Sequence, residues 1–468
     1  MPYFWSMNKT ALLSCPLFFA FFFLVACSSS KKLATSDADP VPETTIEYES
    51  PANPVVENPA PTAKKAPAPL PYIKTDAFLE DMLKAQPQYF DTILQNRGPW
   101  KVQIIYTQVD RKANNEPVFT SYYFNYDSTE YFYPASTVKM PVALLALQKL
   151  HELSLPGLDK YSSLITEAAY SKQTPVYNDP TTPDGRPTVA QYVKKIFLVS
   201  DNDAFNRLYE FMGQEYINGQ LHKMGYGHAE ILHHLDLFMT PDENRHTNPI
   251  KFFDPNGKVL YTQPMQFNEK AYSVRNDSVA NAYYSNGDLV NHAMDFSKKN
   301  RFALDDLTMI LRSVLFPTAV PAKQRFQLTD EDYQFVRKYM SELPTESISP
   351  PYSADTANYW PAFCKFLLYG SEKGPLPKTI RMFNKVGDAY GFLTDVAYIA
   401  DFDKQIEFML SARIYCNTDG ILNDEKYDYD TIGFPFMKRL GQMIYQYELQ
   451  RPRAIKPNLA AFKMVYDK

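Results

Sequence analysis

The chain has 468 residues, of which 45% are hydrophobic and 15% aromatic, and its formal net charge is −5 at pH 7. This is enough apolar material for a sizeable core, and the length allows two or three average domains or one large one. The acidic balance and the lack of a basic block argue against nucleic-acid binding, and four cysteines are too few for a disulfide framework.

The first residues have the pattern of a targeting segment. A short basic start at Lys9 precedes an apolar run over 11–26, whose end reads Leu24-Val-Ala-Cys27. No second apolar run follows, so residues 1–26 are expected to be a cleaved export signal. The four residues from Leu24 to Cys27 resemble the lipobox of bacterial lipoproteins. That resemblance implies a lipidated Cys27 and an envelope location facing the periplasm, with the outer membrane expected, and an ordinary cleavage site is the alternative.

The rest of the chain divides by composition. Residues 27–72 are rich in Pro, Ala, Ser, Thr and Glu, which cannot bury a core, so they are expected to form a disordered tether. One folded domain is expected over 73–455. Within it, a sheet lobe is expected at 73–130 and 379–455 and a helical lobe at 131–378. A C-terminal tail at 456–468 follows the domain.

The folded part shows strand patterns at both ends and helical patterns between them. Strands are predicted at 101–110, 118–126, 379–386, 391–401 and 406–415. Helices are predicted at 77–85, 136–150, 188–197, 204–212, 216–224, 303–315, 330–343, near 362–368 and at 429–450, with a hairpin at 251–263. The simplest assembly is an α/β (α+β) fold in which one five-stranded antiparallel sheet is flanked by helices. A mostly helical second lobe would leave a cleft between the lobes.

One stretch has the residues of a nucleophile pair. Ser136 begins a helix that is apolar nearly all round and therefore expected to be buried, and Lys139 lies one turn on, on the same face. A helix N-terminus offers free N–H groups to a developing oxyanion. Lys139 can act as the base for the serine only if its amine is neutral, which burial and a second cation favour. Ser-x-x-Lys also arises by chance, as at Ser28 and Lys31, and an ordinary helix cap with an exposed lysine is the alternative.

Two further blocks follow Ser136 in order. Ser200-Asp-Asn202 lies at a helix junction, and Lys385-Val-Gly387 lies at a strand end before Tyr-Gly-x-x-x-Asp-x-Ala. With Tyr-Pro-Ala-Ser-Thr-Val-Lys at the first helix, these blocks resemble the class A serine β-lactamases, which belong to the penicillin-recognising serine hydrolases. The resemblance covers most of residues 75–450. It implies a β-lactamase/transpeptidase-like fold and acyl transfer without a cofactor.

The residue types suggest a role for each block. Ser200 is expected to relay a proton between Lys139, Lys385 and the leaving nitrogen of an amide, while Asn202 donates to a substrate carbonyl. Ser-Asp-Asn as a plain helix-capping run, and Lys-Val-Gly as a turn at a strand end, are the alternatives.

The resemblance also places the oxyanion donors, on the backbone N–H groups of Ser136 and Asp388, with Gly387 beside the substrate. Family members usually carry Thr or Ser between Lys and Gly, where the hydroxyl helps to hold a substrate carboxylate. Val386 stands there instead and cannot hydrogen-bond. Arg413 on the following strand is a candidate replacement, and a solvated arginine is the alternative.

A second departure concerns release of the acyl group. The Glu-x-x-x-Asn run that holds the deacylating water in class A enzymes is absent. Asp236, 34 residues after Asn202, is the first candidate base and Glu243 the second, although a solvated loop carboxylate is the alternative for each. Without a base, release would be slow, as in penicillin-binding proteins. His233 and His234 are adjacent and lack a partner set, so no metal is predicted.

Four functions therefore stay open. The leading one is a serine hydrolase acting through Ser136 on a β-lactam or related amide. A peptidoglycan D-Ala-D-Ala peptidase or penicillin-binding protein, an esterase and a non-catalytic wall-binding lipoprotein are the others. Pairing of Cys364 with Cys416 and the role of the inserted residues 250–300 are left open by the sequence.

Overall fold

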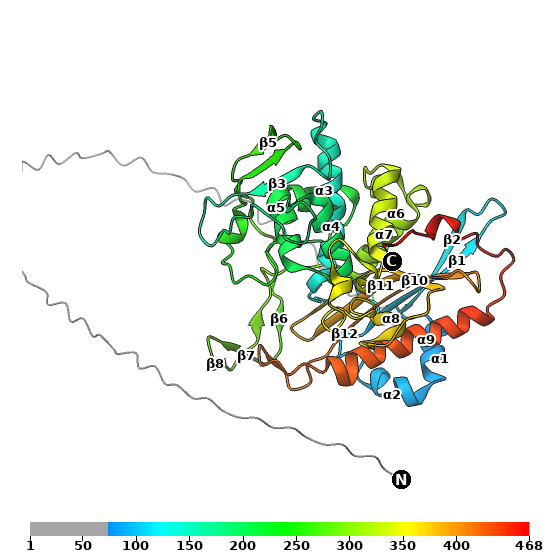
Figure 1. Cartoon of the computed structure of the whole chain (residues 1–468). Coiled ribbons are helices and arrows are strands. Elements are labelled where there is room, and N and C mark those ends of the chain that lie inside the picture. The colour runs from blue at the N-terminus through cyan, green and yellow to red at the C-terminus, as the bar shows by residue number, and fades with distance from the viewer. Residues whose placement is uncertain (1–73, 468) are drawn as a thin grey trace, which may run out of the picture. The chain divides into compact units, whose positions relative to one another are not determined.

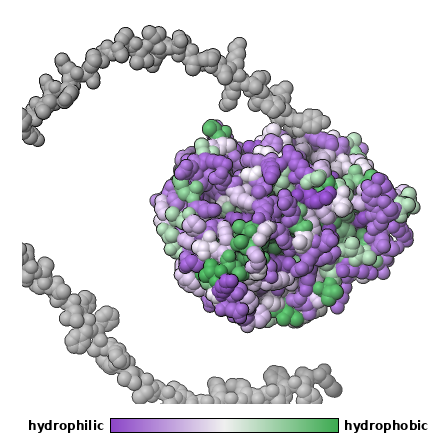
Figure 2. Space-filling view, turned by 90° about the horizontal axis from the view of Figure 1, so that it is seen from above, coloured by the Kyte–Doolittle hydropathy of each residue, from purple (hydrophilic) through white to green (hydrophobic). Residues whose placement is uncertain are grey.

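The computed structural model describes residues 74–467. The expected signal peptide, Cys27 and the tether lie outside the described residues. None of the helices within 74–467 is both long enough and apolar enough to cross a membrane. The face seen in Figure 2 is mostly hydrophilic, with hydrophobic residues gathered in small patches.

A five-stranded antiparallel sheet is built from both ends of the chain, in the order β10-β11-β12-β1-β2 (Figure 1). Its strands are β1 (Gln103–Arg111), β2 (Pro117–Phe124), β10 (Ile380–Ala389), β11 (Phe392–Asp401) and β12 (Ile406–Tyr415). The N-terminal hairpin joins the C-terminal meander through β1 and β12, where Gln103 pairs with Arg413. The predicted α/β architecture with this sheet is confirmed.

Helices cover both faces of the sheet (Figure 1). Along β11, Leu393 and Ala397 enter one hydrophobic cluster, whereas Val396 and Tyr398 enter the other, as the two-residue period of a strand requires. The first cluster is closed by α1 (Ala77–Lys84), α2 (Pro87–Gln95), α8 (Phe366–Tyr369) and α9 (Phe434–Gln450). The second is closed by α6 (Leu304–Leu315) and α7 (Asp330–Ser341). Both β11 and β12 are consequently buried along their whole length.

The helical lobe is organised around α3 (Lys139–Leu153), in which every residue from Lys139 to Leu150 is buried, as predicted. It packs against α4 (Val189–Val199) and α5 (Asn202–Met224). Thr188 caps α4 by accepting a hydrogen bond from the backbone N–H of Gln191. The two helices predicted at 204–212 and 216–224 form one element with a break at Gly213, whose φ of 74° is not helical.

The segment between α5 and α6 contains small strands. The predicted hairpin is present as β4 (Ile250–Phe253) and β5 (Val259–Gln263). A third strand, β3 (Ser163–Thr166), pairs with β4 at the edge of this sheet. Further short strands were not predicted, because two to four residues are too few for a periodic pattern. In this segment they are β6 (Ser278–Val279), β7 (Ala282–Ser285), β8 (Asp288–Val290) and β9 (Met294–Asp295). Another, β13 (Ile421–Leu422), follows β12 and pairs with β7.

Three other details differ from the prediction. The short helix α2 begins at Pro87 and buries only Phe90 and Ile93, so its apolar period is brief. The last α-helix starts at Phe434, after a π-helical turn over Tyr429–Gly433. Beyond residue 455 the chain returns to the core, where Phe462 is buried.

Candidate active site

Ser136 lies in a tight turn at the mouth of the buried helix α3. A 3₁₀ turn over Ala135–Val138 precedes the α-helix, and the Thr137 hydroxyl donates to the carbonyl of Pro134. Ala135 has a φ of 46°, which is uncommon for a residue with a side chain. Such strained backbone is concentrated at functional sites.

The Lys139 amine is held by three neighbours. Its Nζ lies 2.8 Å from Ser136 Oγ and 2.6 Å from Asn202 Oδ1, and it also contacts the carbonyl oxygen of Ser200. The two carbonyl-type oxygens only accept hydrogen bonds, so two N–H groups of the amine are committed to them. Of the two hydroxyls near this nitrogen, Ser136 Oγ is closer than Ser200 Oγ, which lies 3.3 Å away.

The protonation of Lys139 is governed by its surroundings. Its side chain is fully buried, and this burial lowers its pKa well below 10.5; the charge of Lys385 lowers it further. Among the described residues no carboxylate lies within ion-pair distance of its Nζ. Both effects favour the neutral amine more than they would for a lysine in water.

Ser200 connects the two lysines. It ends α4 in the left-handed conformation, with a φ of 60°, and the following Asp201 caps α5 by accepting from the N–H of Ala204. Its Oγ is 2.8 Å from Lys385 Nζ and 3.3 Å from Lys139 Nζ. Burial lowers the pKa of Lys385 to about 8. The helix junction thus aims one hydroxyl at two buried amines.

Gly387 allows β10 to lie against the turn that carries Ser136. A Cβ atom there would fall 2.6 Å from the carbonyl oxygen of Pro134 and 2.9 Å from the backbone nitrogen of Ser136, which is closer than real Cβ atoms come. Gly387 is absent from the cavity lining, whereas the adjacent Asp388 is part of it. The geometry gives Gly387 a spacing role, and its contact with a substrate stays a prediction.

A cavity of about 680 Å³ opens in front of Ser136. Its walls come from five segments of the chain: Tyr133, Ala135 and Ser136; Asn202; 233–239; Lys299; and 388–390 with Asn423, Glu425 and Tyr427. Ser136, Asn202, Asp388 and Asp236 are the sequence-predicted residues found there. The aromatic walls and Lys299 were not predicted, because no local pattern connects them to Ser136.

Arg413 does not reach this cavity. Its side chain is 2% exposed, its guanidinium lies 4.6 Å from the centre of the Phe132 ring, and Nη2 is 3.4 Å from a Glu130 carboxylate oxygen. Burial lowers its pKa to about 10. Because β12 pairs with β1 as well as β11, Arg413 is enclosed at the centre of the sheet, and the alternative of a solvated arginine is also wrong.

The two candidate carboxylates occupy different environments. Asp236 is exposed in the cavity wall, with a φ of 57°. Glu243 lies outside the lining and accepts from the backbone N–H of Thr240 at 2.7 Å and from the Ser171 hydroxyl at 2.9 Å. The Thr240 N–H is the first cause that lowers the Glu243 pKa to about 2. Glu243 therefore fastens its loop and does not face Ser136.

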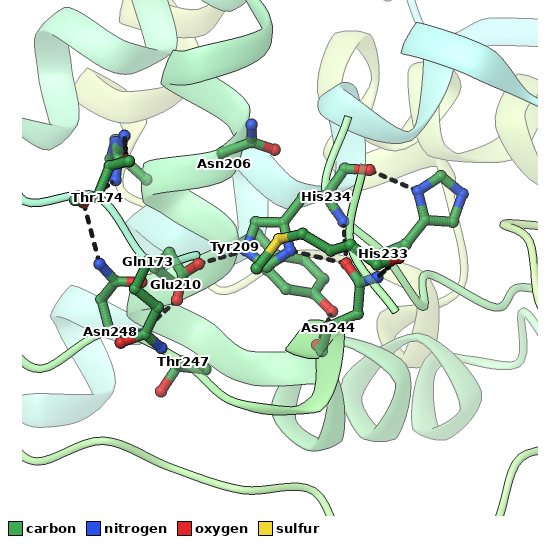
Figure 3. A network of polar contacts seen from close by, with 12 residues as sticks. Gln173, Thr174, Asn206, Tyr209, Glu210, His233, His234, Asn244, Thr247 and Asn248 are labelled. Atoms are coloured by element: carbon green, nitrogen blue, oxygen red, sulfur yellow. Dashed lines mark hydrogen bonds and ion pairs between the residues drawn. The ribbon is translucent and has the colours of Figure 1, made fainter. Parts of the chain in front are cut away.

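A buried polar network holds the loop that carries Asp236 to α5 (Figure 3). His234 Nε2 shares a hydrogen bond with a Glu210 carboxylate oxygen, and Nδ1 donates to Asn244 Oδ1, 2.8 Å away. The Asn244 amide nitrogen donates to the carbonyls of Met239 and Thr240, which fixes its oxygen as the acceptor. The second Glu210 oxygen accepts from the N–H of Asn248. No local sequence pattern predicts this network.

Between residues 74 and 467, no group of three or more His, Cys, Asp or Glu side chains is placed to hold a metal ion. Cys364 and Cys416 are both buried free thiols.

Residues 88–309, slightly less than half of the chain, match the family model described as Beta-lactamase enzyme family. The match contains Ser136, Lys139 and Ser200, and ends before Lys385. It supports a serine β-lactamase-like hydrolase at the level of the family, without identifying a substrate. No curated protein matches the chain significantly.

Solved structures also resemble the chain. A β-lactamase from Xanthomonas campestris pv. campestris is 14% identical, with a TM-score of 0.43, over 78% of this chain and 98% of that one. A class A β-lactamase from Clostridium kluyveri is 15% identical, with a TM-score of 0.42, over 77% and 98%. A penicillin G acyl-enzyme complex of PBP-A (L158E mutant) is 13% identical, with a TM-score of 0.43, over 82% and 100%. At these values the likeness says nothing of activity.

Proposed function

We propose that the chain is a serine hydrolase that acts by acyl transfer through Ser136 on a β-lactam or related amide. One observation carries the proposal. The buried Lys139 amine lies 2.8 Å from Ser136 Oγ, and its other contacts are oxygens that take its N–H groups. A lysine in this position is placed to accept the serine proton.

Acylation would proceed in one sequence of bond changes. Lys139 takes the hydroxyl proton while Ser136 Oγ bonds to the carbonyl carbon, and the carbonyl oxygen becomes an oxyanion. The backbone N–H groups of Ser136 and Asp388 are the proposed donors to it, each contributing roughly 3–4 kcal/mol to lowering the barrier. As the carbon–nitrogen bond breaks, the proton passes from Lys139 through the Ser200 hydroxyl to the leaving nitrogen. Lys385 Nζ, 2.8 Å from Ser200 Oγ, orients that hydroxyl.

Release of the acyl group would require an activated water. Asp236 is the proposed base, because its carboxylate is exposed in the cavity wall that contains Ser136. The exposed position of Asp236 also favours a second candidate function, in which release of the acyl group is slow. Glu243 is committed to Thr240 and Ser171, so Asp236 would act alone, on a loop. Slow release would then make the chain a peptidoglycan D-Ala-D-Ala peptidase or penicillin-binding protein.

We also propose an envelope location through lipidation of Cys27, with the folded unit facing the periplasm. Support comes from the sequence alone, since Cys27 lies outside the described residues. Metabolic labelling with a fatty-acid probe should mark the full chain, and Cys27→Ser should lose both the label and membrane fractionation. Equal labelling of the Cys27→Ser chain would exclude this anchor.

Intact-mass spectrometry of the full chain after exposure to a fluorescent penicillin tests the acyl-transfer proposal. An adduct should form, map to Ser136 and be absent from Ser136→Ala. It should persist in Ser278→Ala, a control at an exposed serine. Rapid loss of the adduct with turnover of a chromogenic cephalosporin would identify a lactamase, and a long-lived adduct would identify the peptidase type. No adduct, or one retained by Ser136→Ala, would overturn the proposal.

A further inference from the structure

The inserted segment before α6 contributes a cation to the cavity in front of Ser136. Among the described residues that line the cavity, Lys299 is the one lysine or arginine, and the other charged side chains there include Asp236, Asp388 and Glu425. No carboxylate of the described residues lies within ion-pair distance of Lys299 Nζ, and the described part of the chain offers this amine no hydrogen bond.

The backbone of Lys299, in contrast, is fixed at both of its polar groups. Its carbonyl oxygen accepts from Arg275 Nη2 at 2.6 Å, and its N–H donates to the carbonyl of Phe296 at 2.9 Å. The next residue, Asn300, is fully buried, and its side-chain oxygen accepts from the N–H of Leu232 at 2.7 Å. The backbone of Lys299 is therefore held in place by hydrogen bonds, whereas its amine has no partner among residues 74–467.

The surroundings of the amine are aromatic and partly dry. Lys299 Nζ lies 5.8 Å from the centre of the Tyr390 ring. Burial lowers the pKa of Lys299, and its charge is one cause, after burial, that lowers the pKa of the nearby His233 to about 3. Removing a cation from water without an anion is unfavourable. The adjacent Lys298 is exposed to solvent and has no such cost.

We propose that Lys299 binds a carboxylate of the substrate that acylates Ser136. This inference rests on the proposed function and narrows its substrates to amides that carry an anionic group. It also accounts for two departures described above, since Val386 has no hydroxyl to offer and Arg413 is enclosed in the sheet. Lys299 is the one lysine or arginine that the described lining of the cavity offers to such an anion.

A pair of matched probes tests the assignment: benzylpenicillin and its methyl ester, which lacks the negative charge. The second-order rate constant for acylation of Ser136 is measured by intact-mass spectrometry of the full chain. Lys299→Met should lower this constant about ten-fold to a hundred-fold for the acid, the effect of losing a charged hydrogen bond, and less than about two-fold for the ester. Lys299→Arg should restore most of the loss, and Lys298→Met should change neither probe. Equal losses for acid and ester, or none, would overturn the anion site.

A binding measurement separates failure of this inference from failure of the acyl-transfer proposal. In the Ser136→Ala chain no acyl group can form, and isothermal titration calorimetry reports the Kd of each probe directly. Adding Lys299→Met should weaken binding of the acid about ten-fold or more and leave the ester unchanged. An acid Kd that does not depend on Lys299 would reject the site, whatever happens at Ser136.

Discussion

Two buried polar clusters border the same cavity, and they bury charge in opposite ways. Around Ser200, two lysines converge on one hydroxyl with no described carboxylate at ion-pair distance, and burial lowers the pKa of both amines. Around Glu210, a carboxylate meets His234, and both partners have their remaining polar atoms bound to Asn248 and Asn244.

The contrast separates a cluster suited to catalysis from a cluster suited to stabilising the fold. Like charges that are buried together cost stability and perturb protonation, which is the usual condition of catalytic groups. A buried pair of opposite charges with complete hydrogen bonds holds its elements in place, and removing one partner leaves the other unpaired. The cluster around Ser200 should therefore control activity, and the cluster around Glu210 should control the stability of the loop that carries Asp236.

The largest effect is expected from Lys139→Met. Loss of the base should lower the acylation rate by about ten-thousand-fold, or about 5.4 kcal/mol in barrier. The free energy of unfolding should change by less than about 2 kcal/mol, because relief of the desolvation of the buried amine offsets the loss of its hydrogen bonds to Asn202 and Ser200. Lys149→Met is the matched control, since Lys149 is also buried on α3 but contacts Phe211 and Gln263. Equal acylation rates in the two variants would show that the cluster around Ser200 does not control activity.

Glu210→Gln should have the next largest effect, on stability. An amide in place of the carboxylate has only one oxygen to accept hydrogen bonds, so either His234 or the N–H of Asn248 loses its acceptor, and the change should cost about 3 kcal/mol in the free energy of unfolding, measured by urea denaturation. Glu215→Gln on the same helix is the control. Its ion pair with Lys270 is exposed, so the change should be below about 0.5 kcal/mol. Similar losses in both variants would show that the Glu210 network is not a structural anchor.

Lys385 should make stability depend on pH. Its pKa is about 8 in the folded chain and 10.5 without the fold, so between these values the unfolded chain binds the extra proton. Raising the pH through this window should therefore increase the free energy of unfolding, by on the order of 3 kcal/mol for this group. Below pH 8 both states are protonated and the contribution is constant. Urea unfolding of the unaltered chain and of Lys385→Met should diverge across the window, and parallel curves would contradict the shift.

Asp236→Asn should have the smallest of these effects. Loss of a general base for the water should lengthen the lifetime of the acyl adduct about a hundred-fold, or about 2.7 kcal/mol, without slowing its formation. Glu243→Gln should change the lifetime by less than about three-fold, because Glu243 is bound to Thr240 and Ser171. A lifetime that responds to Glu243 but not to Asp236 would reverse the assignment.

The parts of the molecule that were predictable have short-range signals. The five strands follow from short runs of β-branched and aromatic residues bounded by turns, and the placement of Ser136 beside Lys139 follows from their spacing on one helix. The parts that were not predictable depend on long-range pairing. Arg413 is enclosed because β12 pairs with β1, about 300 residues earlier in the chain. Lys299 enters the cavity because Arg275 and Phe296 fix its backbone, and neither contact has a periodic signature.

The proposed chemistry depends most directly on the protonation of Lys139. Its amine can be titrated by NMR in the full chain carrying ¹³C-labelled lysine, with the signal assigned by its absence from Lys139→Met. We expect the amine to titrate well below 10.5, because burial and the charge of Lys385 both disfavour its proton. A Lys139 pKa at or above 10.5 would mean that no lone pair faces Ser136, and it would contradict the proposed mechanism.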